Sequence, residues 1–175
     1  NERIKTRILN SGAIGNTKFC SRIINTIQNP QWNALNCYNL RTKCCKLPYV
    51  DYTSTLAHNF VNDRYPLLLQ KYAGAIAANS FNPNAKYWEI SAAGCLTFME
   101  ITKKNKGQFL GYEDGKTAIF INESNYKQKF QDYLRDPENK KWQEIANAGR
   151  NYTLKNFNND KAVSSLVDLM EYLLK

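Results

Sequence analysis

The sequence is poor in histidine and has no long hydrophobic run. His58 is its only histidine, which leaves little material for an imidazole metal site or a serine–histidine catalytic couple. No stretch of about 18 apolar residues occurs, so we expect no membrane-spanning helix. The chain also begins without methionine or an apolar signal region. We therefore expect a fragment that was cut at a domain boundary and that works in the cytoplasm.

The cysteines also lack the pattern of a disulfide framework or a zinc site. There are five, an odd number, and none forms a Cys-x-x-Cys pair. Reduced thiols and no bound metal are the better expectation for a cytosolic protein. The five residues are Cys20, Cys37, Cys44, Cys45 and Cys95.

A strong positive charge is present, but it is spread along the chain. The net charge is +9, from 24 Lys and Arg against 15 Asp and Glu. This balance suits an anionic partner such as nucleic acid, an acidic membrane surface or a phosphorylated small molecule. The sequence has no RNP-like aromatic motif, zinc finger or arginine-rich arm. A basic nucleic-acid-binding module is therefore the third-ranked hypothesis, and we expect no nucleic acid as partner.

Hydrophobic periodicity predicts strands that alternate with helices. The 175 residues suit one domain. Residues 41–53 show no regular pattern and are predicted to be loop. The predicted strands are 7–12, 34–40, 74–79, 95–99 and 117–121, and the predicted helices are 17–28, a broken helix at 54–72, 83–93, 124–135, 137–156 and 160–174. This alternation indicates an α/β, Rossmann-like fold with a mainly parallel sheet flanked by helices.

Ligands of such sheets bind beyond the carboxyl ends of the strands, near helix N-termini. Three segments qualify: residues 11–17, residues 80–85 and the loop after 95–99. In the first, Gly12 would let a phosphate approach backbone amides, although a purely structural turn is the simpler interpretation. Lys18 and Arg22 are four residues apart and could share the helix face that points toward that phosphate.

Glu89 stands among large apolar residues, between Trp88 and Ile90. The predicted helix has Asn82 as N-cap and Pro83 as first residue, which places Glu89 in its second turn. It is either a solvated residue on the outer face or a carboxylate that accepts two hydrogen bonds from a diol such as ribose. Lys86, one turn away, could bind a phosphate or be solvated.

Several spaced motifs resemble the C-terminal half of group 1 glycosyltransferases. They are "AKYWEISAAGCLTFME", "FLGYEDGKTAIFI" and "FQDYLRDPENKKWQEIANAGRNYTLKNF", with "ILNSGAIGNTKFCSR" and "NDRYPLLLQKYAGAIA" upstream. The order and spacing are most similar to the branch of spore-maturation CgeB-like proteins. The resemblance implies a single half of a GT-B fold. The whole chain, 1–175, would be the C-terminal domain that binds a nucleotide-sugar, and the N-terminal acceptor domain would be absent.

The resemblance also implies roles for individual residues. Glu89 matches the second Glu of the Glu–seven residues–Glu motif and would bind the donor ribose. The first Glu, which contacts the transferred sugar in the family, falls at Phe81. The diphosphate-binding residues would be Gly12, Lys18, Arg22, Asn84, Ala85 and Lys86.

The implied activity is metal-independent, retaining glycosyl transfer without a cofactor. The fragment alone should transfer little, since the acceptor and any general base would lie on the absent domain. The alternative is a non-catalytic domain that binds a nucleotide-sugar or another ligand, and Phe81 is its best support.

Overall fold

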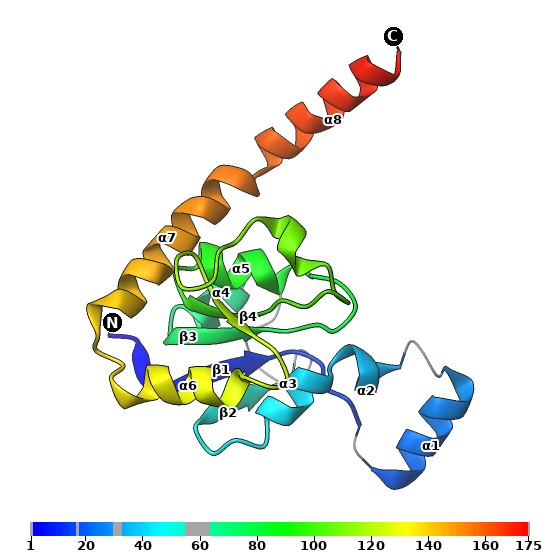
Figure 1. The fold of residues 1–175 in the computed structure, drawn as a ribbon, viewed down its shortest axis with the longest axis vertical. Coiled ribbons are helices and arrows are strands. Elements are labelled where there is room, and N and C mark those ends of the chain that lie inside the picture. Colours follow the sequence, from blue (N-terminus) through cyan, green and yellow to red (C-terminus); the bar gives the residue numbers. More distant parts are fainter. Residues whose placement is uncertain (1, 17, 30–32, 55–63, 175) are drawn as a thin grey trace.

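A parallel sheet forms the centre of the molecule. The computed structural model describes residues 2–16, 18–29, 33–54 and 64–174. The sheet has five strands in the order β2-β1-β3-β4-β5, and each neighbouring pair is parallel (Figure 1). The strands are β1 (Ile4–Ser11), β2 (Val50–Thr53), β3 (Tyr72–Ala77), β4 (Leu96–Glu100) and β5 (Ile119–Ile121). The predicted α/β, Rossmann-like fold is confirmed.

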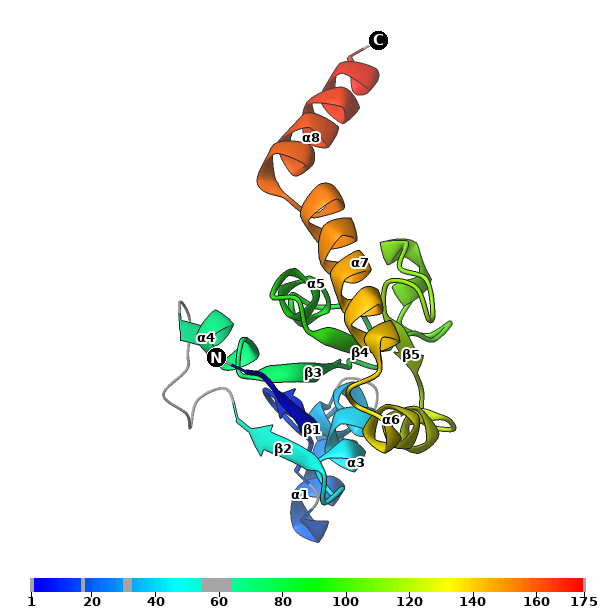
Figure 2. The same cartoon turned by 90° about the vertical axis from the view of Figure 1, so that its left-hand side faces the viewer.

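Helices follow most strands and return the chain to the start of the next parallel strand. They are α1 (Phe19–Gln28), α2 (Ala34–Cys37), α3 (Asn39–Cys44), α4 (Tyr65–Leu69), α5 (Lys86–Ala92), the 3-10 helix η2 (Gly107–Leu110), α6 (Tyr126–Arg135), α7 (Lys140–Asn156) and α8 (Asn159–Leu173). Two of them, α1 and α8, project away from the body that surrounds the sheet (Figures 1 and 2).

Successive strand residues point to opposite faces of the sheet, so each face has its own core. Ile8 packs in one cluster with residues of α3 and α6, whereas Leu9 packs in the other with residues of α4 and α5. Phe98 and Met99 divide between the two clusters in the same way. Both faces are therefore covered, which explains why β3 and most of β4 consist of apolar residues.

The predictions for residues 34–40 and 41–53 are wrong. Residues 34–44 form α2 and α3 instead of a strand, and the second strand is β2, inside the predicted loop. Asn33 starts this helical segment, because its side-chain oxygen accepts a hydrogen bond from the Asn36 amide at 2.9 Å. Leu40 and Cys44, four residues apart, then bury one face of α3.

The predicted start of the helix around Glu89 is also wrong. The helix begins at Lys86, after Ala85 as N-cap, and not at Pro83. Asn84 precedes this turn, and its side-chain oxygen accepts a hydrogen bond from the Lys86 amide at 3.2 Å. At the other end Gly94 has a φ of +74°, which fits the predicted stop.

The broken helix predicted at 54–72 lies partly outside the described residues. Its described part forms α4 and then enters β3 at Tyr72. All five cysteines are free thiols. None of the helices in the described ranges is both long and apolar enough to cross a membrane.

Candidate functional site

The carboxyl end of β1 brings three polar side chains together from separate parts of the chain. Ser11 ends β1, Tyr65 begins α4 and Lys86 begins α5. The Ser11 and Tyr65 hydroxyl oxygens are 2.7 Å apart, and Lys86 Nζ lies 3.4 Å from the first and 3.3 Å from the second. We call these three residues the Lys86 cluster. It stands at the sheet edge where ligands of parallel sheets bind.

The charge of Lys86 is held in an unfavourable environment. Burial and the neighbouring charge of Arg41 lower the pKa of Lys86 to about 8, while Glu89 acts in the opposite direction. Burial also raises the pKa of Tyr65 to about 12, so this side chain stays a neutral phenol at physiological pH. The cluster is therefore a partly desolvated ammonium beside two hydroxyl groups, an arrangement suited to an anionic oxygen.

Arg41 is a second cation beneath the same edge. It is only 2% exposed, and its guanidinium donates to the carbonyl oxygens of Ala13 at 3.1 Å and Ala78 at 2.6 Å. These bonds tie the segment after β1 to the segment after β3. No ion pair with a carboxylate involves Lys86 or Arg41 among the residues that the structure describes. Two adjacent cations without a paired anion favour an anionic ligand.

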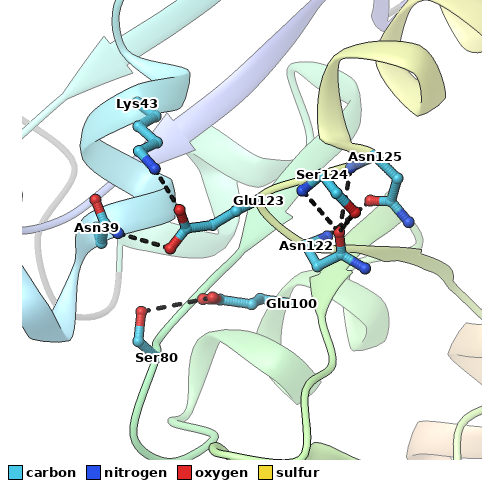
Figure 3. A network of polar contacts seen from close by, with 8 residues as sticks. All are labelled: Asn39, Lys43, Ser80, Glu100, Asn122, Glu123, Ser124 and Asn125. Carbon is cyan, nitrogen blue, oxygen red and sulfur yellow. Dashed lines mark hydrogen bonds and ion pairs between the residues drawn. The ribbon is translucent and has the colours of Figure 1, made fainter.

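A cleft opens on the other side of this edge, beyond the ends of β3, β4 and β5. Its volume is about 420 Å³. Glu100 ends β4, lines the cleft and is only 3% exposed. Its carboxylate accepts a long hydrogen bond of 3.5 Å from the Ser80 hydroxyl (Figure 3) and also interacts with the Asn79 backbone amide. The lining residues are Asn36, Asn39, Ser80, Glu100, Thr102, Lys104, Asn122, Glu123 and Ser124.

Glu100 is fixed in place but incompletely paired. Its carbonyl oxygen accepts hydrogen bonds from Tyr87 at 3.0 Å and Asn105 at 2.7 Å. Its carboxylate atom Oε2 is buried and has no hydrogen-bond partner among the residues that the structure describes. Burial, and to a lesser extent the charge of Glu123, raise the pKa of Glu100 to about 7, while Arg41 acts in the opposite direction.

The structure places Glu89 on the solvent side of α5. Tyr87 and Ile90 are buried, and Trp88 stacks on Phe157 with 5.8 Å between ring centroids, whereas Glu89 is exposed. The apolar neighbours of Glu89 thus pack on other sides of α5, and the Glu89 carboxylate is exposed to solvent. Glu89 still lies close enough to the Lys86 cluster for its charge to raise the pKa of Lys86.

The predicted phosphate-binding residues do not all meet. Lys86 is in the cluster, and Gly12 adjoins it through Ser11, but the Gly12 amide already donates to the Thr53 carbonyl at 2.9 Å. The Lys86 amide is likewise engaged, by the Asn84 side chain. Ala85, the N-cap of α5, is exposed beside them.

Lys18 and Arg22 lie elsewhere. Both are exposed at the start of α1, which stands apart from α4 and α5 in both views (Figures 1 and 2). Arg22 lines a separate groove with Lys43 and Lys46. The structure therefore does not bring Lys18 and Arg22 to the Lys86 cluster.

Sequence reasoning missed Tyr65, Arg41 and Glu100. Glu100 had a usable signal, because it directly follows an apolar strand at the predicted ligand edge. Arg41 had no such signal, because it lies in residues 41–53, which were wrongly predicted to be loop. The described ranges contain no group of three or more His, Cys, Asp or Glu side chains that could hold a metal ion.

A comparison with known protein families identifies the family of most of the chain. The family model described as glycosyl transferase-like matches residues 13–168, which include α1, every strand after β1 and most of α8. A search among curated proteins found no match to the sequence. The matched family and the parallel α/β fold agree with half of a GT-B enzyme and support glycosyl transfer at a general level. The chain belongs to the glycosyl transferase-like family.

Proposed function

We propose that this chain is the C-terminal, donor-binding domain of a GT-B glycosyltransferase, close to the CgeB-like branch, and that it binds a nucleotide-sugar. The observation that carries the proposal is the pair of neighbouring cations, Lys86 and Arg41, at the carboxyl edge without a paired carboxylate among the described residues. A diphosphate supplies the missing negative charge. Family membership supports the transferred group being a sugar.

Each residue of the Lys86 cluster has a role in this proposal. Lys86 Nζ and the hydroxyls of Ser11 and Tyr65 donate to the diphosphate oxygens, and Arg41 adds charge from below. Glu89, exposed next to Lys86, accepts hydrogen bonds from the ribose hydroxyls. Fixed positive charge stabilises the leaving diphosphate, so the transfer is metal-independent and, as in the resembling enzymes, retaining. The acceptor binds an N-terminal domain.

Substitution of Lys86 tests the proposal. Lys86→Met keeps the length of the side chain and removes its charge. We expect it to weaken UDP or GDP binding at least about tenfold, since hydrogen bonds to charged groups contribute roughly 1.5–3 kcal/mol, and to leave uridine or guanosine binding nearly unchanged. Isothermal titration of both ligand classes measures this. Lys140→Met, at an exposed site on α7, is the control.

The pH dependence gives a second measurement on the same ligands. Because Lys86 loses its proton near pH 8, wild-type affinity for the diphosphate should fall as the pH rises through this value. Lys86→Met should abolish that decline. Equal losses for nucleoside and diphosphate would show that the phosphates bind elsewhere.

A non-catalytic binding domain is the second candidate. Phe81 supports it, since this residue stands where the resemblance expects a Glu, and its ring receives Lys104 Nζ at 4.0 Å from the centroid. The first candidate binds a nucleotide-sugar, and the second binds a nucleotide-sugar or another ligand. Donor hydrolysis or transfer by the full-length protein distinguishes them. We also place the protein in the cytoplasm, where its five free thiols would stay reduced.

A further inference from the structure

Helix α1 carries a row of large apolar side chains in solvent. They follow helical spacing, so they lie on one side of the helix. They are Phe19 at 76%, Ile23 at 44%, Ile24 at 52% and Ile27 at 76% exposure. The helix stands away from the sheet in both views (Figures 1 and 2). A gathered apolar face of this kind is typical of an interaction site.

Basic side chains flank this apolar face. Lys18 directly precedes α1, and Arg22 follows one turn later. Both are exposed, and neither forms an ion pair with another of the described residues. Such an arrangement is typical of helices that lie in a membrane interface, because the long basic side chains reach the lipid phosphates.

A groove with three basic residues runs beside α1. Its volume is about 460 Å³, and its charged lining residues are Arg22, Lys43 and Lys46. Lys43 is paired with Glu123, whereas Lys46 is exposed and forms no ion pair within the described ranges. The other lining residues are neutral: Leu35, Asn36, Asn39 and Thr42. The groove therefore attracts anionic groups such as phosphates.

The surrounding sequence leaves this positive charge without acidic neighbours. Between Glu2 and Asp51 the chain has no Asp or Glu, although Lys and Arg recur in that segment. The other projecting helix, α8, also exposes apolar residues but contains Asp160, Asp168 and Glu171. An apolar face beside uncompensated positive charge is therefore a property of α1 and not of both projecting helices.

An anionic lipid bilayer supplies both kinds of partner at one surface. Its acyl region accepts apolar side chains, and its phosphates attract Lys and Arg. A protein partner would need an apolar groove ringed by acidic residues to enclose a helix that projects on its own (Figure 1). A bilayer needs no such groove, because a projecting amphipathic helix can lie in the plane of the interface. These observations favour the bilayer.

We propose that α1 binds this protein to an anionic membrane surface, with Phe19 and Ile27 inserted among the acyl chains and Lys18, Arg22 and Lys46 at the lipid phosphates. The helix lies on the membrane and does not span it, because its 10 residues are too few to cross the hydrocarbon core. The proposal goes beyond the donor site and does not depend on it, since α1 stands apart from α4 and α5.

Flotation with lipid vesicles tests the proposal on the complete protein and on the 175-residue chain. Both should bind vesicles made of equal parts of phosphatidylcholine and phosphatidylglycerol, and neither should bind phosphatidylcholine alone. Binding should weaken as the salt concentration rises, because salt screens the charges. Absence of binding to the anionic vesicles at low salt would overturn the proposal, as would equal binding to both kinds of vesicle.

Matched substitutions separate α1 from the rest of the surface. Lys18→Gln with Arg22→Gln should weaken vesicle binding at least about tenfold, since each basic residue near an anionic surface contributes roughly fivefold. Lys140→Gln with Lys155→Gln removes the same charge from exposed sites on α7 and should change binding much less. Equal weakening by the two pairs would contradict a specific role of α1. Circular dichroism checks that each variant folds.

The apolar contribution has its own pair of variants. Phe19→Ser should weaken binding at least about fivefold, whereas Phe109→Ser, which changes a side chain of 80% exposure on η2, should leave it unchanged. Insertion itself is measured with Phe19→Trp and Phe109→Trp. Brominated acyl chains should quench the added fluorescence of the first and not of the second. An unquenched Phe19→Trp would contradict insertion.

Two results would assign the apolar face to another occupant and overturn the proposal. Vesicle binding by the 175-residue chain but not by the complete protein would show that another domain covers α1. A dimer in ultracentrifugation that Phe19→Ser dissociates would show that a second copy covers it. UDP and GDP titrations of the same variants should match wild type, so failure of the membrane proposal and failure of the proposed function are distinguishable.

Discussion

At the scale of single residues, the carboxyl edge concentrates charges that the fold does not pair. Lys86 and Arg41 lie close together without a carboxylate partner among the described residues, and Glu100 is buried with one oxygen unpaired. Each of these charges lowers the stability of the folded state. Unpaired charges that persist at one edge are typical of binding sites, where the ligand completes the pairing.

Glu100 should therefore make stability depend on pH. Its pKa is raised from the ordinary value of 4.5 to about 7, so folding takes up a proton between these values. The stability that this raised pKa contributes to the wild-type protein is fully present below pH 4.5 and is lost as the pH rises through 7. Glu100→Gln never ionises. Its unfolding free energy relative to wild type should thus rise by about 1–3 kcal/mol between pH 5 and pH 8.5.

Urea denaturation of both proteins at the two pH values measures this difference. The comparison cancels any constant effect of the glutamine amide. Glu144→Gln, at its exposed position, should differ from wild type equally at both pH values. A Glu100→Gln offset that is the same at pH 5 and pH 8.5 would contradict the raised pKa.

The sequence alone predicts the environments of only some of the charged residues at this edge. Helical periodicity alone could have placed Glu89 outside, because Tyr87, Ile90 and Ser91 form the buried face of α5. The environment of Arg41 could not be read in this way. Its partners are Asn10, 31 residues away, and Ala78, 37 residues away, and no local pattern encodes contacts at such separations.

At the scale of elements, uniformly apolar strands were predictable and the segment before β2 was not. β3 and β4 are covered on both faces, so their sequences contain little besides apolar residues. Residues 34–44 instead form two short helices of four and six residues, which are too short to show a helical period. Tertiary packing of Leu40 and Cys44 stabilises α3, and the Asn33 side chain caps α2.

The contact between α7 and the loop before β5 depends on a glycine. A Cβ atom at Gly149 would lie 2.2 Å from the Thr117 carbonyl oxygen and 3.0 Å from the Ser91 hydroxyl. Gly149→Ala must therefore push α7 away from the sheet. We expect a loss of about 1–3 kcal/mol in unfolding free energy, although alanine favours helices over glycine by about 1 kcal/mol.

Thermal or urea unfolding measures this loss. Asn151→Ala, at an exposed position on the same helix, is the matched control and should stabilise slightly, by less than about 0.7 kcal/mol. If both variants were equally stable, the close approach of α7 to Thr117 would be wrong.

At the scale of the whole molecule, two helices contribute little to the common core. α8 has no buried residue, and its residues Leu166, Met170 and Leu173 are more than half exposed. α1 likewise exposes Phe19 and Ile27 at 76% each. Both helices leave the body in Figures 1 and 2. The stability of the described domain must therefore come from β1 and from the residues between the two helices.

A pair of truncations tests this division. Removal of residues 159–175 deletes only α8 and the last residues, and keeps Phe157, whose ring stacks on Trp88 and on Tyr112 with centroids 5.8 Å and 6.0 Å apart. The Tm should change by less than about 3 °C, because roughly 1 kcal/mol corresponds to 2–4 °C in a domain of this size. Unfolding should stay cooperative.

Removal of residues 152–175 is the contrasting variant. It also deletes the Tyr152 hydroxyl, which donates to the Leu110 carbonyl at 2.8 Å, and Thr153, whose hydroxyl lies 2.7 Å from that of Tyr112. Each lost hydrogen bond costs about 0.5–1.5 kcal/mol, and each lost aromatic pair of the partly buried Tyr152 and Phe157 costs a similar amount. The Tm should therefore fall by at least about 4 °C. Differential scanning calorimetry of both truncations gives the answer. A large loss of Tm in the shorter deletion would mean that α8 belongs to the core, which its lack of buried residues argues against.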